Sequence, residues 1–121
     1  MLRSMIQVYV KESNRAVAFY QKVFNAKLHC NHLNENGTVL HAELDVFGMT
    51  LAVSESAGPE PVAGNTVQIC LHFGAGKEDA VRRIIEELGE GGTFTYRGET
   101  GWSPLMAGII DTFGVWWCVY V

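Results

Sequence analysis

The chain has 121 residues, of which 48% are hydrophobic and 18% are charged, and its formal net charge is −4. This length suits one domain, and the composition is that of a globular protein with a core rather than of a disordered chain. The negative charge and the absence of a long apolar run argue against nucleic acid or a membrane as the main partner.

The first half of the chain predicts a strand, a helix and three further strands. Residues 6–10 are β-branched and aromatic, which favours a strand. Asn14 is a candidate N-cap for a helix whose apolar residues recur at helical spacing as far as Phe24, and Asn25 is a candidate stop. Asn36 and Gly37 predict a two-residue hairpin turn. We expect the remaining strands at about 27–33, 38–46 and 49–55, the last two joined by a turn at Phe47 and Gly48.

A segment rich in glycine and proline, which contains Gly58, Pro59, Pro61 and Gly64, predicts a linker near the middle of the chain. After it the same order of elements recurs. We expect strands at about 66–73, 93–97, 105–110 and 115–121, and a helix at 77–88 with an apolar face of Ala80, Val81, Ile84, Ile85 and Leu88. The chain is thus predicted to be a single domain over 1–121, with module one at about 1–57, a linker at about 58–64 and module two at about 65–121.

Two short matches in the same order support an internal repeat. Residues 6–10 (IQVYV) match residues 67–71 (VQICL), and residues 44–48 (LDVFG) match residues 110–114 (IDTFG). Each Asp-x-Phe-Gly stretch is followed by an apolar strand, and each pair of matches flanks a helical segment. The sequence therefore predicts an α+β fold of two tandem βαβββ modules that form a curved mixed sheet.

The three cysteines, Cys30, Cys70 and Cys118, are odd in number and widely spaced. We therefore expect no disulfide framework and a reducing, cytoplasmic location. The opening residues run directly into a strand pattern without a signal-peptide core, which favours the same location. All three thiols are interpreted as small, buried, apolar side chains.

Several segments together resemble a known superfamily. They are residues 16–20 (AVAFY) with 23–26 (VFNA), 41–44 (HAEL) with 50–54 (TLAVS), 99–102 (ETGW) and 111–117 (DTFGVWW). Over nearly its whole length the chain resembles the vicinal oxygen chelate proteins, which include glyoxalase I, extradiol dioxygenases, and fosfomycin and bleomycin resistance proteins. Within them it is similar to the PhnB-like branch. The resemblance implies a half-open barrel with a cleft, and a homodimer.

The resemblance also implies where a metal would bind. Metal-bearing members place histidine or carboxylate ligands on the first and last strands of each module. Aligned through the internal repeat, these positions are Gln7, Ala52, Gln68 and Cys118. A glutamine carbonyl is a weak ligand for nickel, zinc or iron, and alanine offers no ligand atom. We therefore expect no metal cofactor at the usual positions.

The predicted function is the binding of a small molecule in the cleft, without the usual metal. Neutral polar and aromatic side chains suit a flat or amphipathic ligand. The expected cleft residues are Gln7, Tyr9, Gln68, Cys70, Trp102 and Cys118. For Trp116 and Trp117 we favour a role in the core. The sequence leaves open whether the protein is an enzyme.

The alternative is a metal-dependent lyase or dioxygenase-like enzyme with an unorthodox divalent metal site. His41 and Glu43 share a face of one predicted strand, and His72 alternates with Gln68 and Cys70. The ordinary interpretation of the first two is a cross-strand polar pair, and that of His72 is a half-exposed polar residue. His29 and His32 are expected on opposite faces of their strand, at the surface. No phosphate-binding loop, nucleophile elbow or methyl-donor motif is present.

Overall fold

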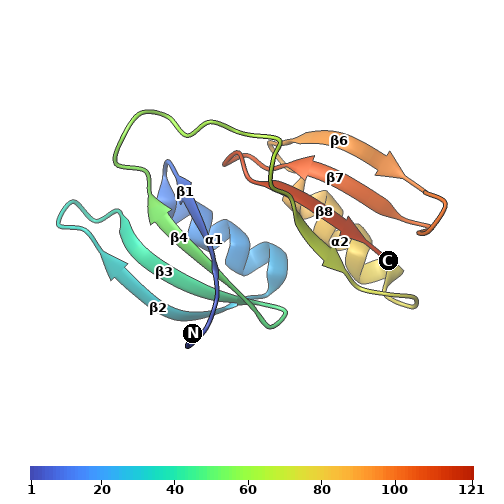
Figure 1. The fold of residues 1–121 in the computed structure, drawn as a ribbon, viewed down its shortest axis with the longest axis horizontal. Helices are drawn as coiled ribbons and strands as arrows, with labels where there is room; N and C mark the ends of the chain where they lie inside the picture. Colours follow the sequence, from blue (N-terminus) through green and yellow to red (C-terminus); the bar gives the residue numbers. More distant parts are fainter. The chain divides into compact units, whose positions relative to one another are not determined.

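The computed structural model describes residues 1–121, which fold into two compact units, Met1–Pro61 and Val62–Val121. Each unit contains a strand, a helix and three further strands in chain order, so the predicted α+β fold of two βαβββ modules is confirmed (Figure 1). We refer to the units as module one and module two. Each has its own four-stranded mixed sheet.

In module one the sheet order is β1-β4-β3-β2, with β1 parallel to β4 and the other pairs antiparallel. The parallel pair requires a crossover connection, and the single helix supplies it. The elements are β1 (Ile6–Val10), α1 (Ser13–Phe24), β2 (Lys27–Leu33), β3 (Val39–Val46) and β4 (Met49–Glu55).

Module two repeats this arrangement with the order β5-β8-β7-β6, and β5 is parallel to β8. Its elements are β5 (Ile69–His72), α2 (Glu78–Leu88), β6 (Thr93–Gly98), β7 (Met106–Ile110) and β8 (Trp116–Tyr120). The predicted strand at 66–73 is therefore shorter than expected, and Gln68 precedes it. Ala80 is exposed rather than part of the apolar face of α2.

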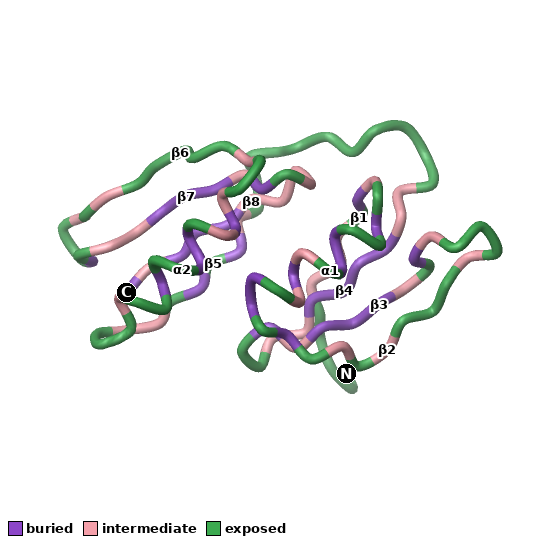
Figure 2. The backbone as a smooth tube through the Cα atoms, turned by 180° about the vertical axis from the view of Figure 1, so that it is seen from behind, coloured by how far each residue is buried: buried purple, intermediate pink, exposed green.

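Each helix covers one face of the sheet in its own module. In module one, Leu44 and Leu51 are paired on neighbouring strands and are both fully buried, as is Tyr20 of α1. In module two, Ile109 and Trp117 are the corresponding fully buried pair. Figure 2 shows the central strands as mainly buried, whereas β2 and β6 at the sheet edges are mainly exposed. Neither helix has the length and apolar character required to span a membrane.

The start of α1 differs from the prediction. The helix begins at Ser13, and its N-cap residue is Glu12 rather than Asn14. The backbone N–H of Ser13 donates to Glu55 Oε1 at 3.0 Å. A carboxylate from β4 therefore accepts a hydrogen bond at the helix N-terminus, where no local side chain provides a cap. Asn14 instead donates from its side chain to the carbonyl of Gly37. Asn25 ends the helix as predicted, and it adopts the left-handed conformation.

The β2–β3 connection is also longer than predicted. It spans residues 34–38 instead of two residues, because the backbone N–H of Asn34 donates to the carbonyl of Thr38. Asn36 Oδ1 accepts from the backbone N–H and the hydroxyl of Thr38, which stabilises the loop. By contrast, the turn between β3 and β4 has the predicted two residues, Phe47 and Gly48, both with positive φ as a type I′ turn requires.

The aspartate of each repeated Asp-x-Phe-Gly stretch stabilises its turn. Asp45 Oδ1 accepts from the N–H of Gly48 at 2.7 Å in an exposed turn. Asp111 Oδ1 accepts from the N–H groups of Phe113 and Val115, and its Oδ2 accepts from Trp117 Nε1 at 2.9 Å. Asp111 is buried, so its hydrogen bonds connect the turn directly to the core of module two.

Both modules also contain the same irregularity in the second strand of their chain order, which is the edge strand β2 in module one and β6 in module two. In β2 the register passes from Leu28 opposite Leu44 to Cys30 opposite Glu43, so His29 is an extra residue. In β6 it passes from Phe94 opposite Ile109 to Tyr96 opposite Gly108, so Thr95 is extra. Such β-bulges change which side chains face each side of a sheet.

We expect Asp111→Ala to destabilise the protein by roughly 3 kcal/mol, because it removes three hydrogen bonds to a buried carboxylate and leaves the Trp117 indole N–H unpaired. Asp45→Ala, the matched variant in module one, should cost at most about 1 kcal/mol because its turn is exposed. Urea denaturation of both variants measures the difference. Equal losses would contradict the assignment of Asp111 to the core of its module.

Candidate functional site

The sheet of module one has an open face, defined here as the face opposite α1, that carries a row of paired positions across its four strands, three of them with polar or thiol side chains. In register, Gln7 lies opposite Ala52, Ala52 opposite Glu43, and Glu43 opposite Cys30. Residues directly opposite each other on neighbouring strands point to the same side. Because the alternating positions fill the apolar face under α1, this row belongs to the open face.

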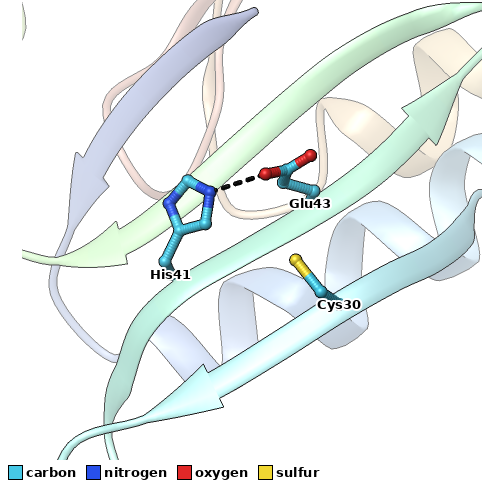
Figure 3. A group of neighbouring side chains, drawn as sticks. All are labelled: Cys30, His41 and Glu43. Atoms are coloured by element: carbon cyan, nitrogen blue, oxygen red, sulfur yellow. Dashed lines mark hydrogen bonds and ion pairs between the residues drawn. The ribbon is translucent and has the colours of Figure 1, made fainter.

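Glu43 is the centre of a polar cluster on this face. Its carboxylate accepts two hydrogen bonds from Arg3, with Nη1 at 2.5 Å from Oε1 and Nη2 at 3.0 Å from Oε2. His41 Nε2 lies 2.8 Å from Oε2. The Cys30 thiol approaches from β2, and ligand atoms of Cys30, His41 and Glu43 all lie within 4.8 Å of one another (Figure 3).

The Glu43 carboxylate is held in its ionised form. Hydrogen bonds from Arg3 and then from His41 lower the pKa of Glu43 to about 2, although burial opposes them. In turn, the hydrogen bonds to Glu43 and its negative charge raise the pKa of the Arg3 guanidinium. An ionised carboxylate has no proton to donate, so His41 Nε2 is the donor in its hydrogen bond with Glu43. The residue as a whole is only 8% exposed.

Arg3 lies on the segment that precedes β1, and its side chain is 49% exposed. It also lines a groove of about 550 Å³ at one end of the module one sheet. The groove combines methionine and isoleucine side chains with polar groups, and its lining comprises Arg3, Ser4, Met5, Ile6, Gly48, Met49 and Thr50. This volume is within the range of small-molecule pockets.

The role of Cys30 was missed by the sequence interpretation, which treated it as a buried apolar residue. Strict alternation from Leu28 would place His29 opposite Glu43 and turn Cys30 toward α1. The bulge at His29 reverses this assignment, so that Cys30 faces Glu43 and is partly exposed. No sequence signal marks the bulge, because neither glycine nor proline is present in β2.

The two predicted cleft residues of module one lie on this open face. Gln7 donates from Nε2 to Ser54 Oγ at 2.9 Å and to the carbonyl of Val8 at 3.1 Å. Tyr9 lies opposite Ser54 in register and is 62% exposed. Gln7 therefore has its amide fixed within the sheet, whereas the Tyr9 ring is free to contact a ligand.

In module two, Cys70 lies directly opposite Cys118 on β8. Cys70 is exposed and Cys118 is buried, so the expectation of buried thiols holds for Cys118 only. Gln68 is adjacent to this pair, since its Oε1 accepts from Cys70 Sγ at 3.8 Å. Burial, with a smaller effect of Cys70, raises the pKa of the Cys118 thiol to about 11.

Trp102 stands in the loop between β6 and β7 and is 72% exposed. His72 stacks on Tyr120 with ring centroids 4.4 Å apart and is not part of the Cys30, His41 and Glu43 group. Trp117 is fully buried as expected, but Trp116 is only partly buried, and its indole N–H has no hydrogen-bond partner although the nitrogen itself is covered.

The positions at which the resemblance would place a metal do not fit one. The register makes Cys70, rather than Gln68, the counterpart of Gln7, because Gln7 lies opposite Ala52 and Cys70 lies opposite Cys118. With either residue, the four positions contain no histidine or carboxylate. The Gln7 amide is hydrogen-bonded elsewhere, and the Cys118 thiol remains protonated near neutral pH.

We expect iodoacetamide to modify Cys70 in the folded protein at about pH 8 and to leave Cys118 unmodified. A pKa of about 11 leaves roughly one Cys118 thiol in a thousand ionised at that pH, and its thiolate fraction should rise about tenfold per pH unit as the pH approaches 11. Mass spectrometry of tryptic peptides, with a urea-unfolded sample as control, measures both sites. Equal labelling of Cys70 and Cys118 in the folded protein would contradict this prediction.

The fold is shared with several solved structures. The chain is similar to protein PA1353 from Pseudomonas aeruginosa, with a TM-score of 0.82 and 21% identity over 99% of this chain and 97% of that chain. It is similar to the PhnB protein from Bacillus cereus, with a TM-score of 0.78 and 15% identity over 98% of each chain.

A third similar structure is the fosfomycin resistance protein FosX from Listeria monocytogenes in complex with Mn(II) and sulfate. Its TM-score is 0.71, with 16% identity over 98% of this chain and 90% of that chain. At these identities the likenesses show the fold alone. No curated protein matches the chain.

A family model provides the assignment at the level of sequence. It matches residues 4–119, which cover nearly all of both modules. The match extends across both βαβββ modules, so the family model describes the whole two-module fold. The chain therefore belongs to the Glyoxalase/Bleomycin resistance protein/Dioxygenase superfamily.

Proposed function

We propose that this protein binds a small, amphipathic molecule without a metal at the positions used by metal-bearing members of its superfamily. The observation that carries the proposal is the donor set at those positions, which consists of an amide, a methyl group and thiols. Such a set does not favour the divalent ions that histidine and carboxylate ligands hold. The proposed finer placement is the PhnB-like branch, and it rests on the sequence segments 16–20, 23–26, 99–102 and 111–117.

The groove of module one supports a binding function. It has a volume of about 550 Å³, and its lining mixes Met5, Ile6 and Met49 with the hydroxyl of Thr50. Methionine side chains adapt to ligands of different shape, and a nearby hydroxyl can orient a polar substituent. An amphipathic small molecule matches this lining better than a strongly charged one, because the Arg3 charge is already neutralised by Glu43.

Module two offers a second feature in favour of ligand binding. The indole nitrogen of Trp116 is buried without a hydrogen-bond partner. Buried polar groups are rarely left unsatisfied in proteins, so a ligand acceptor or a bound water is expected to pair with it.

The homodimer and the cytoplasmic location expected from the sequence remain predictions.

We expect a panel of flat, amphipathic aromatic compounds, screened by thermal shift in the presence of EDTA, to contain at least one compound that raises Tm and binds stoichiometrically by calorimetry. Thr50→Trp should weaken that binding at least tenfold because it fills the groove. Thr93→Trp, the same change at an exposed strand position of module two, is the matched control. Binding that appears only after a divalent metal is added would contradict the proposal.

A metal-dependent enzyme is the second candidate function, and the proximity of Cys30, His41 and Glu43 favours it. It requires an ion at a place other than the first and last strands of each module. Of the residues considered for this from the sequence, His41 and Glu43 are adjacent, whereas His72 is stacked on Tyr120 in the other module. Turnover that depends on added metal and is lost in His41→Ala would favour the enzyme.

A further inference from the structure

We propose that Cys30, His41 and Glu43 form a zinc site on the open face of module one, and that Arg3 occupies the Glu43 carboxylate when no ion is bound. This site lies on β2 and β3, not on the strands that carry the usual ligands of the superfamily. The inference concerns ion binding by these residues and does not depend on the proposed binding of a small molecule.

The donor set matches the chemistry of zinc. Thiolate, imidazole and carboxylate are its common protein ligands, and three of them with an open fourth position are typical of a site accessible to water or substrate. Tetrahedral zinc with its usual bond lengths places one sulfur and two nitrogen or oxygen ligand atoms roughly 3.3–3.6 Å apart. The three ligand atoms here all lie within 4.8 Å of one another, so side-chain adjustments of at most about 1.5 Å are sufficient.

The backbone holds these side chains in place. His41 and Glu43 alternate on β3, which is hydrogen-bonded to β2 on one side and to β4 on the other. Cys30 reaches the same face only because of the bulge at His29, and in Figure 3 its sulfur points toward Glu43. Ligands carried by paired strands are more precisely positioned than ligands on loops.

Arg3 is the feature that controls access to this site. It engages both carboxylate oxygens of Glu43, so an ion must displace at least one of its hydrogen bonds. Its guanidinium would also repel a divalent cation at this short distance. Yet Arg3 lies outside the sheet on the segment before β1, with its side chain 49% exposed, so the guanidinium can move into water while the strands stay fixed.

The test is titration of the reduced, EDTA-stripped and then desalted protein with Co²⁺ as a spectroscopic probe, followed by competition with Zn²⁺. We expect one equivalent to bind with a thiolate-to-cobalt charge-transfer band, which Cys30→Ser abolishes. Cys70→Ser, the matched change of an exposed thiol in module two, should leave the band intact. Arg3→Ala should strengthen binding at least tenfold, whereas Arg15→Ala, another exposed arginine of module one, should leave it unchanged.

Two results would overturn the inference. The first is a charge-transfer band that survives in Cys30→Ser and is lost in Cys70→Ser, which would assign the thiol ligand to module two. The second is the absence of Co²⁺ and Zn²⁺ binding in Arg3→Ala, whose substitution lies outside the strands and leaves the three ligands in place. Circular dichroism of each variant verifies that the fold is retained.

Discussion

The register of each four-stranded sheet is the constraint on which the rest of the molecule depends. Because each helix covers one face of its sheet, Leu44 and Leu51 in module one, and Ile109 and Trp117 in module two, are fixed on the inner side. A slip of one residue would turn these side chains outward and bring polar ones into the core. The burial of four large apolar side chains thus determines which polar groups the opposite faces present.

Much of the fold could be predicted from the sequence because the local signals were strong. Strands β1, β2 and β4, the helix stop at Asn25 and the turn at Phe47 and Gly48 agree with the prediction. The start of α1 could not be predicted, since its N-terminus is served by Glu55 from a strand far along the chain. Side chains that act across such sequence distances leave no local pattern to read.

The candidate site was less predictable than the fold, and the reason is physical. His41 and Glu43 could be paired from their alternation on one strand, but Cys30 and Arg3 could not be added to them. Cys30 joins the cluster through a bulge that interrupts the period of two, and Arg3 joins it from a segment outside the sheet. The sequence alignment of Gln68 with Gln7 was also wrong. Gln7 lies opposite Ala52, but the residue opposite Cys118 is Cys70, two positions after Gln68.

The bulges at His29 and Thr95 also determine what each module tolerates at the position facing them. Each bulge adds one residue beside the residue that is paired across the sheet, which is Cys30 opposite Glu43 in β2 and Tyr96 opposite Gly108 in β6. The facing position carries a carboxylate in module one and no side chain in module two. A Cβ at Gly108 would collide with Thr95 Oγ1, so a larger residue could be accommodated there only if Thr95 moved.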